Sequence, residues 1–123
     1  MAFLNKDRPL EKQVPKQNVD YELIVAICNA NCTDMVMNAA RSAGARGGTV
    51  IHGKGTGKIG TTKFHKLSII DEREVILIAT RTDQKTQIMQ AVLRDAGPTT
   101  EAGTILFSLP VTEIAGFQMM DDE

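Results

Sequence analysis

Four short apolar runs and two stretches of helical spacing make up most of the chain. The runs have the length and composition of β-strands: Tyr21–Cys28, Thr49–His52, Leu67–Ile70 continued by Val75–Thr80, and Ile105–Leu109. The polar segment Asp-Glu-Arg-Glu at 71–74 interrupts the third run, and Pro110 is expected to end the fourth. The first run is almost continuously apolar, which is typical of a central strand.

Two helices are predicted, one after the first run and one after the third. The first spans Asp34 to Ala43, with Gly44 as its closing glycine and with an apolar face of Val36, Ala39, Ala40 and Ala43. Asp83 is expected to cap the second helix, which ends at Gly97-Pro98 and carries Ile88, Met89 and Val92. The resulting order is β-α-β-β-α-β, the ferredoxin-like arrangement of the α+β class.

Two alanine-rich helices would cover one face of this sheet and leave the other face bare. A strongly apolar sheet face is unfavourable in water, so we expect that face to be buried in an oligomer. The predicted domain covers residues 21–115. A polar arm over 1–20, interrupted by prolines, precedes it, and an acidic tail over 116–123 follows it.

Length, composition and charge narrow the class of protein. A chain of 123 residues fits one domain with a modest core, and its 42% hydrophobic content is ordinary for a globular protein. The net charge of −1 argues against broad binding to nucleic acid or a membrane surface. Because no apolar run approaches a membrane span and the first 20 residues lack the apolar core of a signal peptide, we expect a cytoplasmic protein.

The segment from Gly53 to Lys58, Gly-Lys-Gly-Thr-Gly-Lys, is the most informative part of the chain. From Gly47 to Ile70 there are four lysines and six glycines and no acidic residue. Glycines let backbone N–H groups approach an anion closely, and lysines supply charge for phosphate or carboxylate. The sequence therefore predicts an anion-binding loop between two strands. The alternative is a mobile, solvated hairpin tip that binds nothing specific.

This segment resembles two enzyme motifs but matches neither of them. Gly55-x-Gly57-x-x-Gly60 matches the dinucleotide fingerprint, but residues 61–67 are β-branched and alternating, where that motif requires a helix. A P-loop would place Ser or Thr after Lys58, where the chain has Ile59. Neither a dinucleotide enzyme nor a P-loop enzyme is therefore predicted.

The two cysteines and two histidines give a poor metal site. Cys28 and Cys32 are too few for a disulfide scaffold, and His52 and His65 flank the glycine segment without nearby carboxylates. Cys28 is expected to be a small buried hydrophobe at a strand end. Cys32 is expected at a helix N-terminus, where its thiol pKa would fall.

Over roughly Tyr21 to Val111 the chain resembles the PII family of signal-transduction proteins. Four segments carry the resemblance by their order and spacing: the strand 24–27 (Ile-Val-Ala-Ile), the turn 44–50 (Gly-Ala-Arg-Gly-Gly-Thr-Val), the segment 54–58 (Lys-Gly-Thr-Gly-Lys) and the strand 104–107 (Thr-Ile-Leu-Phe). In the family, the third segment opens the long T-loop and the fourth leaves the B-loop.

The resemblance implies a homotrimer of ferredoxin-like subunits that is not an enzyme. Such proteins bind adenine nucleotide, and sometimes 2-oxoglutarate, and regulate a transporter, an enzyme or a transcription factor through the T-loop. Lys58 would replace the family's phosphate-facing Arg, and Arg73 would replace its phosphate-binding Lys. The implied nucleotide-binding residues are Thr49, Gly55, Thr56, Gly57, Lys58, Arg73, Ala102, Gly103 and Thr104.

The chain also departs from the family pattern. The T-loop region is several residues shorter and has no tyrosine for uridylylation, since Tyr21 is the only one. Ile59 stands where 2-oxoglutarate-sensing members carry Gln, and the B-loop Gly-Asp-Gly-Lys becomes Glu-Ala-Gly-Thr at 101–104. The C-terminal Arg-x-Arg segment is absent.

These residues are compatible with three functions to different degrees. The first is a regulatory sensor of an adenine nucleotide with no resident cofactor, for which ADP, AMP or a cyclic nucleotide is as plausible as ATP. The second is a trimeric metal-binding or metal-tolerance protein, with Cys28, Cys32, His52 and His65 as ligands. The third is an enzyme, and it has the least support because no nucleophile has a base and an orienting partner at workable spacing.

Overall fold

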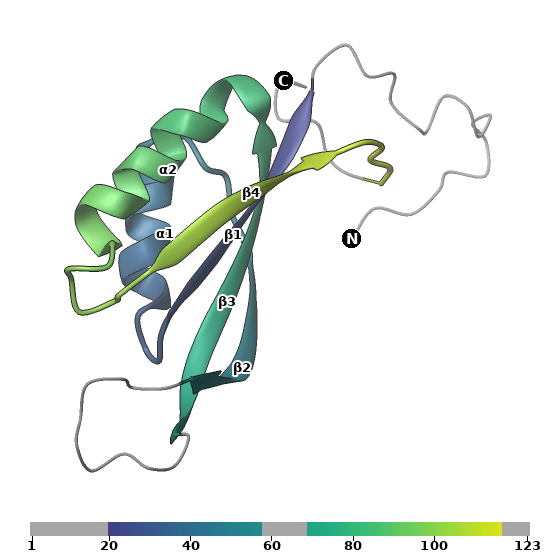
Figure 1. Ribbon diagram of the computed structural model, residues 1–123. Helices are drawn as coiled ribbons and strands as arrows, with labels where there is room; N and C mark the ends of the chain where they lie inside the picture. The colour runs from purple at the N-terminus through teal and green to yellow at the C-terminus, as the bar shows by residue number, and fades with distance from the viewer. Residues whose placement is uncertain (1–19, 58–68, 117–123) are drawn as a thin grey trace.

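A four-stranded antiparallel sheet with two helices on one face forms the fold (Figure 1). The computed structural model describes residues 20–57 and 69–116. The elements follow in the predicted order: β1 (Tyr21–Asn29), α1 (Thr33–Ser42), β2 (Thr49–Gly57), β3 (Ile69–Arg81), α2 (Thr82–Ala96) and β4 (Ile105–Val111). The predicted arm and most of the predicted tail lie outside the described residues.

The strands lie in the order β2-β3-β1-β4, so β1 and β3 are central. All three neighbouring pairs are antiparallel. This confirms the α+β ferredoxin-like fold that the apolar pattern predicted. Gly44, with a φ of 113°, follows the C-cap Ala43 of α1, and Gly97 caps α2, as expected for both glycines.

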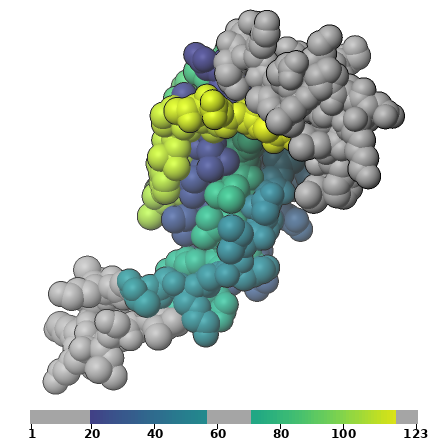
Figure 2. All heavy atoms as spheres, turned by 90° about the vertical axis from the view of Figure 1, so that its right-hand side faces the viewer, coloured from purple at the N-terminus to yellow at the C-terminus, as the bar shows by residue number. Residues whose placement is uncertain are grey.

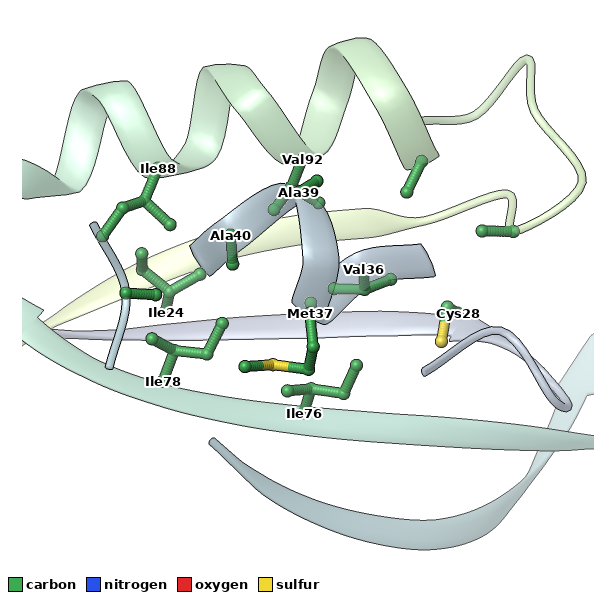
Figure 3. Packing of buried hydrophobic residues seen from close by; sticks show 14 of the residues in the cluster. Ile24, Cys28, Val36, Met37, Ala39, Ala40, Ile76, Ile78, Ile88 and Val92 are labelled. Atoms are coloured by element: carbon green, nitrogen blue, oxygen red, sulfur yellow. The ribbon is translucent and has the colours of Figure 1, made fainter. Parts of the chain in front are cut away.

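The hydrophobic core lies between the helices and one sheet face (Figure 3). Alternate residues of a strand share a face, and Ile24, Ile76 and Ile78 point from the sheet toward the helices, all with 0% exposure. The helices bury Val36, Met37, Ala39 and Ala40 from α1 and Ile88 and Val92 from α2. Cys28 belongs to this cluster and is 1% exposed, which confirms its reading as a small buried hydrophobe.

Neither of the two described helices, α1 and α2, lies over the opposite sheet face, part of which is seen in Figure 2. Cross-strand register and alternation place apolar residues of all four strands there: Ile51; Val75, Leu77 and Ala79; Leu23, Val25 and Ile27; Ile105, Phe107 and Leu109. We call this set the open apolar face. Four of its members are exposed large hydrophobics, among them Ile105 at 63% and Phe107 at 42%.

Several predicted element boundaries were wrong. β2 does not end at His52 but pairs with β3 through Gly57, so Gly53–Gly57 is strand and not a loop. The polar segment 71–74 does not interrupt β3, because it pairs with β2 throughout. Both errors have one cause: the two segments pair with each other, and this pairing satisfies backbone hydrogen bonds whatever the side chains are.

Two single-residue expectations were also wrong. Pro110 does not stop β4, which continues to Val111. β4 is an edge strand, where a missing N–H is tolerated on the unpaired side. Asp83 is not the cap of α2: the helix begins at Thr82 with Arg81 at the N-cap, and Asp83 in the first turn pairs with Arg81 at 2.8 Å.

Candidate functional site

Arg73 lies where three strands meet, at the end of the sheet. Its cross-strand neighbours are Gly53 on β2 and Asn29 on β1, and beyond Asn29 only β2 and β3 continue as a two-stranded ribbon (Figure 1). A Cβ on Gly55 would come within 3.1 Å of the Arg73 Cγ. The Arg73 side chain therefore lies along the glycine side of β2, which has no side chains to block it.

The Arg73 guanidinium is partly exposed and weakly paired. Its Nη2 lies 3.6 Å from Oδ2 of Asp71, and its Nη1 donates a hydrogen bond to the Glu72 carbonyl at 3.1 Å. The side chains of Arg73 and Asp71 are 33% and 36% exposed. Among the carboxylates of the segment 71–74, Asp71 is therefore the one that pairs with Arg73. An exposed pair of this kind contributes about 0–1 kcal/mol, so an anionic ligand could displace it.

The loop between α2 and β4 reaches the same end of the sheet. Ala102 and Thr104 are fully buried, and Gly103 has a φ of 56°, which favours glycine. Asn29 holds this loop: its N–H donates to the Ala102 carbonyl at 2.9 Å and its Nδ2 donates to the Glu101 carbonyl at 3.0 Å. Asn29 thus stands between Arg73 and the loop.

Not every predicted site residue joins this group. Gly55 lies beside Arg73, whereas Thr56 alternates to the other face of β2. Thr49 begins β2 opposite Leu77, four residues before Gly53, so it lies roughly 13 Å from that position along the strand. Gly57 is the last residue of β2, and Lys58 lies outside the described residues.

Sequence reasoning missed a buried carboxylate next to Arg73. Glu74 is 6% exposed and faces the helices. Its Oε1 accepts hydrogen bonds from the Thr33 N–H at 3.1 Å and the Thr33 hydroxyl at 2.6 Å, and its Oε2 accepts one from the Asn31 N–H at 3.1 Å. The available signal was alternation, since Glu74 shares a strand face with Ile76 and Ile78.

These hydrogen bonds lower the pKa of Glu74, the bond from the Thr33 hydroxyl most of all, followed by that from the Asn31 N–H. Burial acts in the opposite direction and His52, with Nδ1 3.7 Å from Oε2, adds to the lowering. A buried carboxylate is tolerated in its charged form when donors surround it. Glu74 is therefore an acceptor for the start of α1.

The cysteine thiols are not activated. Cys32 is the N-cap of α1, as predicted, but its pKa is raised, first by burial and then by the charges of Glu101 and Glu74. The expected fall was wrong, because these effects exceed that of the helix N-terminus. Burial, with Glu74 and Cys32, raises the pKa of Cys28 to about 11.

Among residues 20–57 and 69–116, no three or more His, Cys, Asp or Glu side chains form a group that could hold a metal. His65, the fourth proposed ligand, lies outside these ranges. The observations therefore give the metal-binding alternative no support.

Comparison with known proteins decides the family. Residues 21–119 match the profile of the family described as nitrogen regulatory protein P-II. The chain belongs to the P-II family. Among solved structures, GlnK from B. subtilis has a similar fold, with a TM-score of 0.53 and 15% sequence identity, over 76% of this chain and 86% of that one. No curated protein sequence matches the chain.

Membership in the P-II family makes this chain a regulatory signal-transduction protein and not an enzyme, as the resemblance of its motifs implied. The likeness to GlnK at 15% identity concerns the fold alone. In the part of the chain that the structure describes, neither helix has the length and apolarity needed to cross a membrane.

Proposed function

We propose that this P-II protein is a cytoplasmic homotrimer that senses an adenine nucleotide between neighbouring subunits and controls a partner protein, a transporter or an enzyme, through the segment that joins β2 and β3. The observation that carries the proposal is the position of Arg73. A weakly paired cation lies beside a strand with no side chains at Gly53 and Gly55, at the end of the sheet that the α2–β4 loop also reaches.

The open apolar face supports the trimeric part of the proposal. Exposed large hydrophobics of β2 and β4 lie on the sheet face opposite to α1 and α2. Contact with other copies of the chain would remove this face from water. Subunits packed through their sheets would also bring the Arg73 end of one subunit near its neighbour, as a shared ligand site requires.

Titration calorimetry of the full chain against ATP, ADP, AMP, cyclic AMP and 2-oxoglutarate tests the ligand. We expect an adenine nucleotide to bind and Arg73→Ala to weaken binding by about 10- to 150-fold, the range for a charge-assisted hydrogen bond. Lys58→Ala is expected to weaken it as well, while Arg41→Ala, which removes an exposed cation from α1, serves as the control. Unchanged affinity in both Arg73→Ala and Lys58→Ala would place the pocket elsewhere.

A further inference from the structure

The turn between β1 and α1, residues 29–33, lies between β3 and the α2–β4 loop and contacts both. On one side, Asn29 donates two hydrogen bonds to the loop, and the Cys32 Sγ lies 3.9 Å from the Glu101 carbonyl. On the other side, Asn31 and Thr33 donate to the Glu74 carboxylate. The turn therefore acts as a spacer whose two sides are held by different parts of the fold.

Each part that the turn contacts carries residues of the proposed nucleotide site. Glu74 follows Arg73 on β3 and faces the opposite side of the strand. The α2–β4 loop carries Ala102 and Gly103, and a Cβ on Gly103 would lie 3.0 Å from the Asn29 Nδ2. The position of the loop relative to Arg73 thus depends on how the turn is held.

The Glu74 carboxylate fixes the turn in a conformation that is not intrinsically favoured. Asn31 has a φ of 65°, in the left-handed region that Asn adopts more readily than most residues but less readily than glycine. Both oxygens of Glu74 are occupied by donors of the turn, and Thr33 supplies two of them. Without an acceptor there, the partly buried N–H groups of Asn31 and Thr33 would lose their protein partner.

The groups around Glu74 come from β1, β2 and the turn itself. Across the sheet it faces Cys28 on β1 and His52 on β2. Cys32 of the turn is also close enough for the Glu74 charge to act on its thiol. Both thiols have raised pKa values and remain neutral, and His52 is 73% exposed. Of these groups, the Cys32 backbone N–H also donates toward Glu74 and helps to lower its pKa, so it acts together with Asn31 and Thr33.

We propose that Glu74 is a positioning residue for the nucleotide site: its carboxylate holds the 29–33 turn, and through Asn29 the turn holds the Ala102–Gly103 loop at a fixed distance from Arg73. This inference rests on the proposed function, which places a ligand between Arg73 and that loop. Glu74 does not itself contact the ligand, because it faces the helices.

The first test is nucleotide affinity in Glu74→Gln. The amide keeps the size of the side chain but replaces one acceptor oxygen with a donor, which then faces a backbone N–H. We expect affinity to fall by about 2- to 30-fold, the range for residues that act on a site through others. Glu113→Gln makes the same change at an exposed position beyond β4 and is expected to leave affinity unchanged. Equal affinity of Glu74→Gln and the unaltered chain would overturn the inference.

Thr33 provides the second pair of variants and a rescue. Thr33→Ser keeps the hydroxyl that donates to Glu74 at 2.6 Å, whereas Thr33→Val keeps the shape and removes the donor. We expect Thr33→Val to weaken nucleotide binding and Thr33→Ser to bind nucleotide with an affinity close to that of the unaltered chain. Equal losses in both variants would indicate a packing effect and contradict positioning through the carboxylate. This pair also serves if Glu74→Gln does not fold.

Amide hydrogen exchange without nucleotide separates this inference from the proposed function. Glu74→Gln, or Thr33→Val, is expected to accelerate exchange at Asn31 and Thr33, and also at Asn29, whose N–H donates to Ala102. Faster exchange at Asn31 and Thr33 with unchanged exchange at Asn29 would show that the turn does not carry the effect to the loop. If no adenine nucleotide binds the unaltered chain, the proposed function fails, and exchange at Asn29 still decides whether Glu74 positions the loop.

Discussion

At the scale of single residues, Asp71 limits how readily Arg73 can bind an anion. The two side chains are 3.6 Å apart and about one-third exposed, so their attraction is screened by water. A phosphate approaching Arg73 would have to displace Asp71 and would meet its negative charge. Asp71 therefore opposes anion binding at this position.

We expect Asp71→Asn to strengthen nucleotide binding by about 2- to 5-fold, since exposed ion pairs are weak and only part of the repulsion is removed. Asp83→Asn is the control, because Asp83 pairs with Arg81 next to the start of α2. Calorimetry at low salt gives the comparison. Weaker binding in Asp71→Asn would mean that Asp71 supports the ligand and does not compete with it.

Glu74 makes the free energy of unfolding depend on pH in the acid range. Its folded-state pKa lies below the ordinary value of 4.5, so the unfolded chain takes up the proton more readily than the folded chain. Its contribution is present above about pH 4.5 and is lost as the pH falls through the lowered folded-state pKa. Near neutral pH, Glu74→Gln should lower the free energy of unfolding by about 1–3 kcal/mol, because a partly buried donor of the turn then loses its acceptor.

Urea unfolding at a series of pH values measures this contribution. We expect the difference between the unaltered chain and Glu74→Gln to shrink as the pH is lowered below 4.5, because the carboxyl group is then protonated first in the unfolded chain and, at lower pH, in the folded chain. A difference that stays constant over the acid range would rule out the charge of Glu74 as its source.

At the scale of elements, the path of the Arg73 side chain along the β2–β3 ribbon depends on the glycines of β2. Gly55 leaves room for the arginine stem, since an added Cβ would lie 3.1 Å from its Cγ, close to the backbone end of the side chain. Gly53 has nothing within 4 Å of the same added atom. The two glycines are two residues apart on one strand face, which makes them a matched pair.

Gly55→Ala is expected to displace the Arg73 side chain from its rotamer and to weaken nucleotide binding by about 2- to 10-fold. Gly53→Ala should leave the affinity close to that of the unaltered chain. Calorimetry on both variants provides the measurement. If both substitutions weaken binding equally, the ligand approaches the backbone of β2 directly. Displacement of the Arg73 side chain is then not the cause of the weaker binding.

At the scale of the whole molecule, the open apolar face requires a partner surface. Phe107, at the middle of β4, is 42% exposed in the single chain. Phe107→Asp would place a charge on this face without disturbing the core between sheet and helices. Leu93→Asp makes a similar change at a residue of α2 that is 53% exposed on the other side of the molecule.

We expect light scattering to give three times the chain mass of 13.4 kDa for the unaltered protein and for Leu93→Asp. Phe107→Asp is expected to shift the mass toward that of one chain, because burying an unpaired charge in an interface is unfavourable. A single-chain mass for the unaltered protein at micromolar concentration would contradict the trimer and, with it, a ligand site shared between subunits.

The amino-acid pattern by itself determined the order of elements, both helices and the side of the sheet that they cover. Apolar alternation and helical spacing are local signals, and the closing glycines Gly44 and Gly97 mark where backbone conformation must change. The same local reading singled out the glycines and lysines of 53–58, because they lie in one segment, whereas Arg73 was assigned through the resemblance to the P-II family.

Tertiary structure alone decided where the strands end and what holds the site together. Gly53–Gly57 and the polar segment 71–74 are strand because each pairs with the other, a fact that neither segment contains alone. Glu74 is buried and charged because Asn31 and Thr33, 43 and 41 residues earlier, donate to it. Its partners come from a different element, so the burial of this carboxylate and the lowered pKa that follows could not be read from the residues around it.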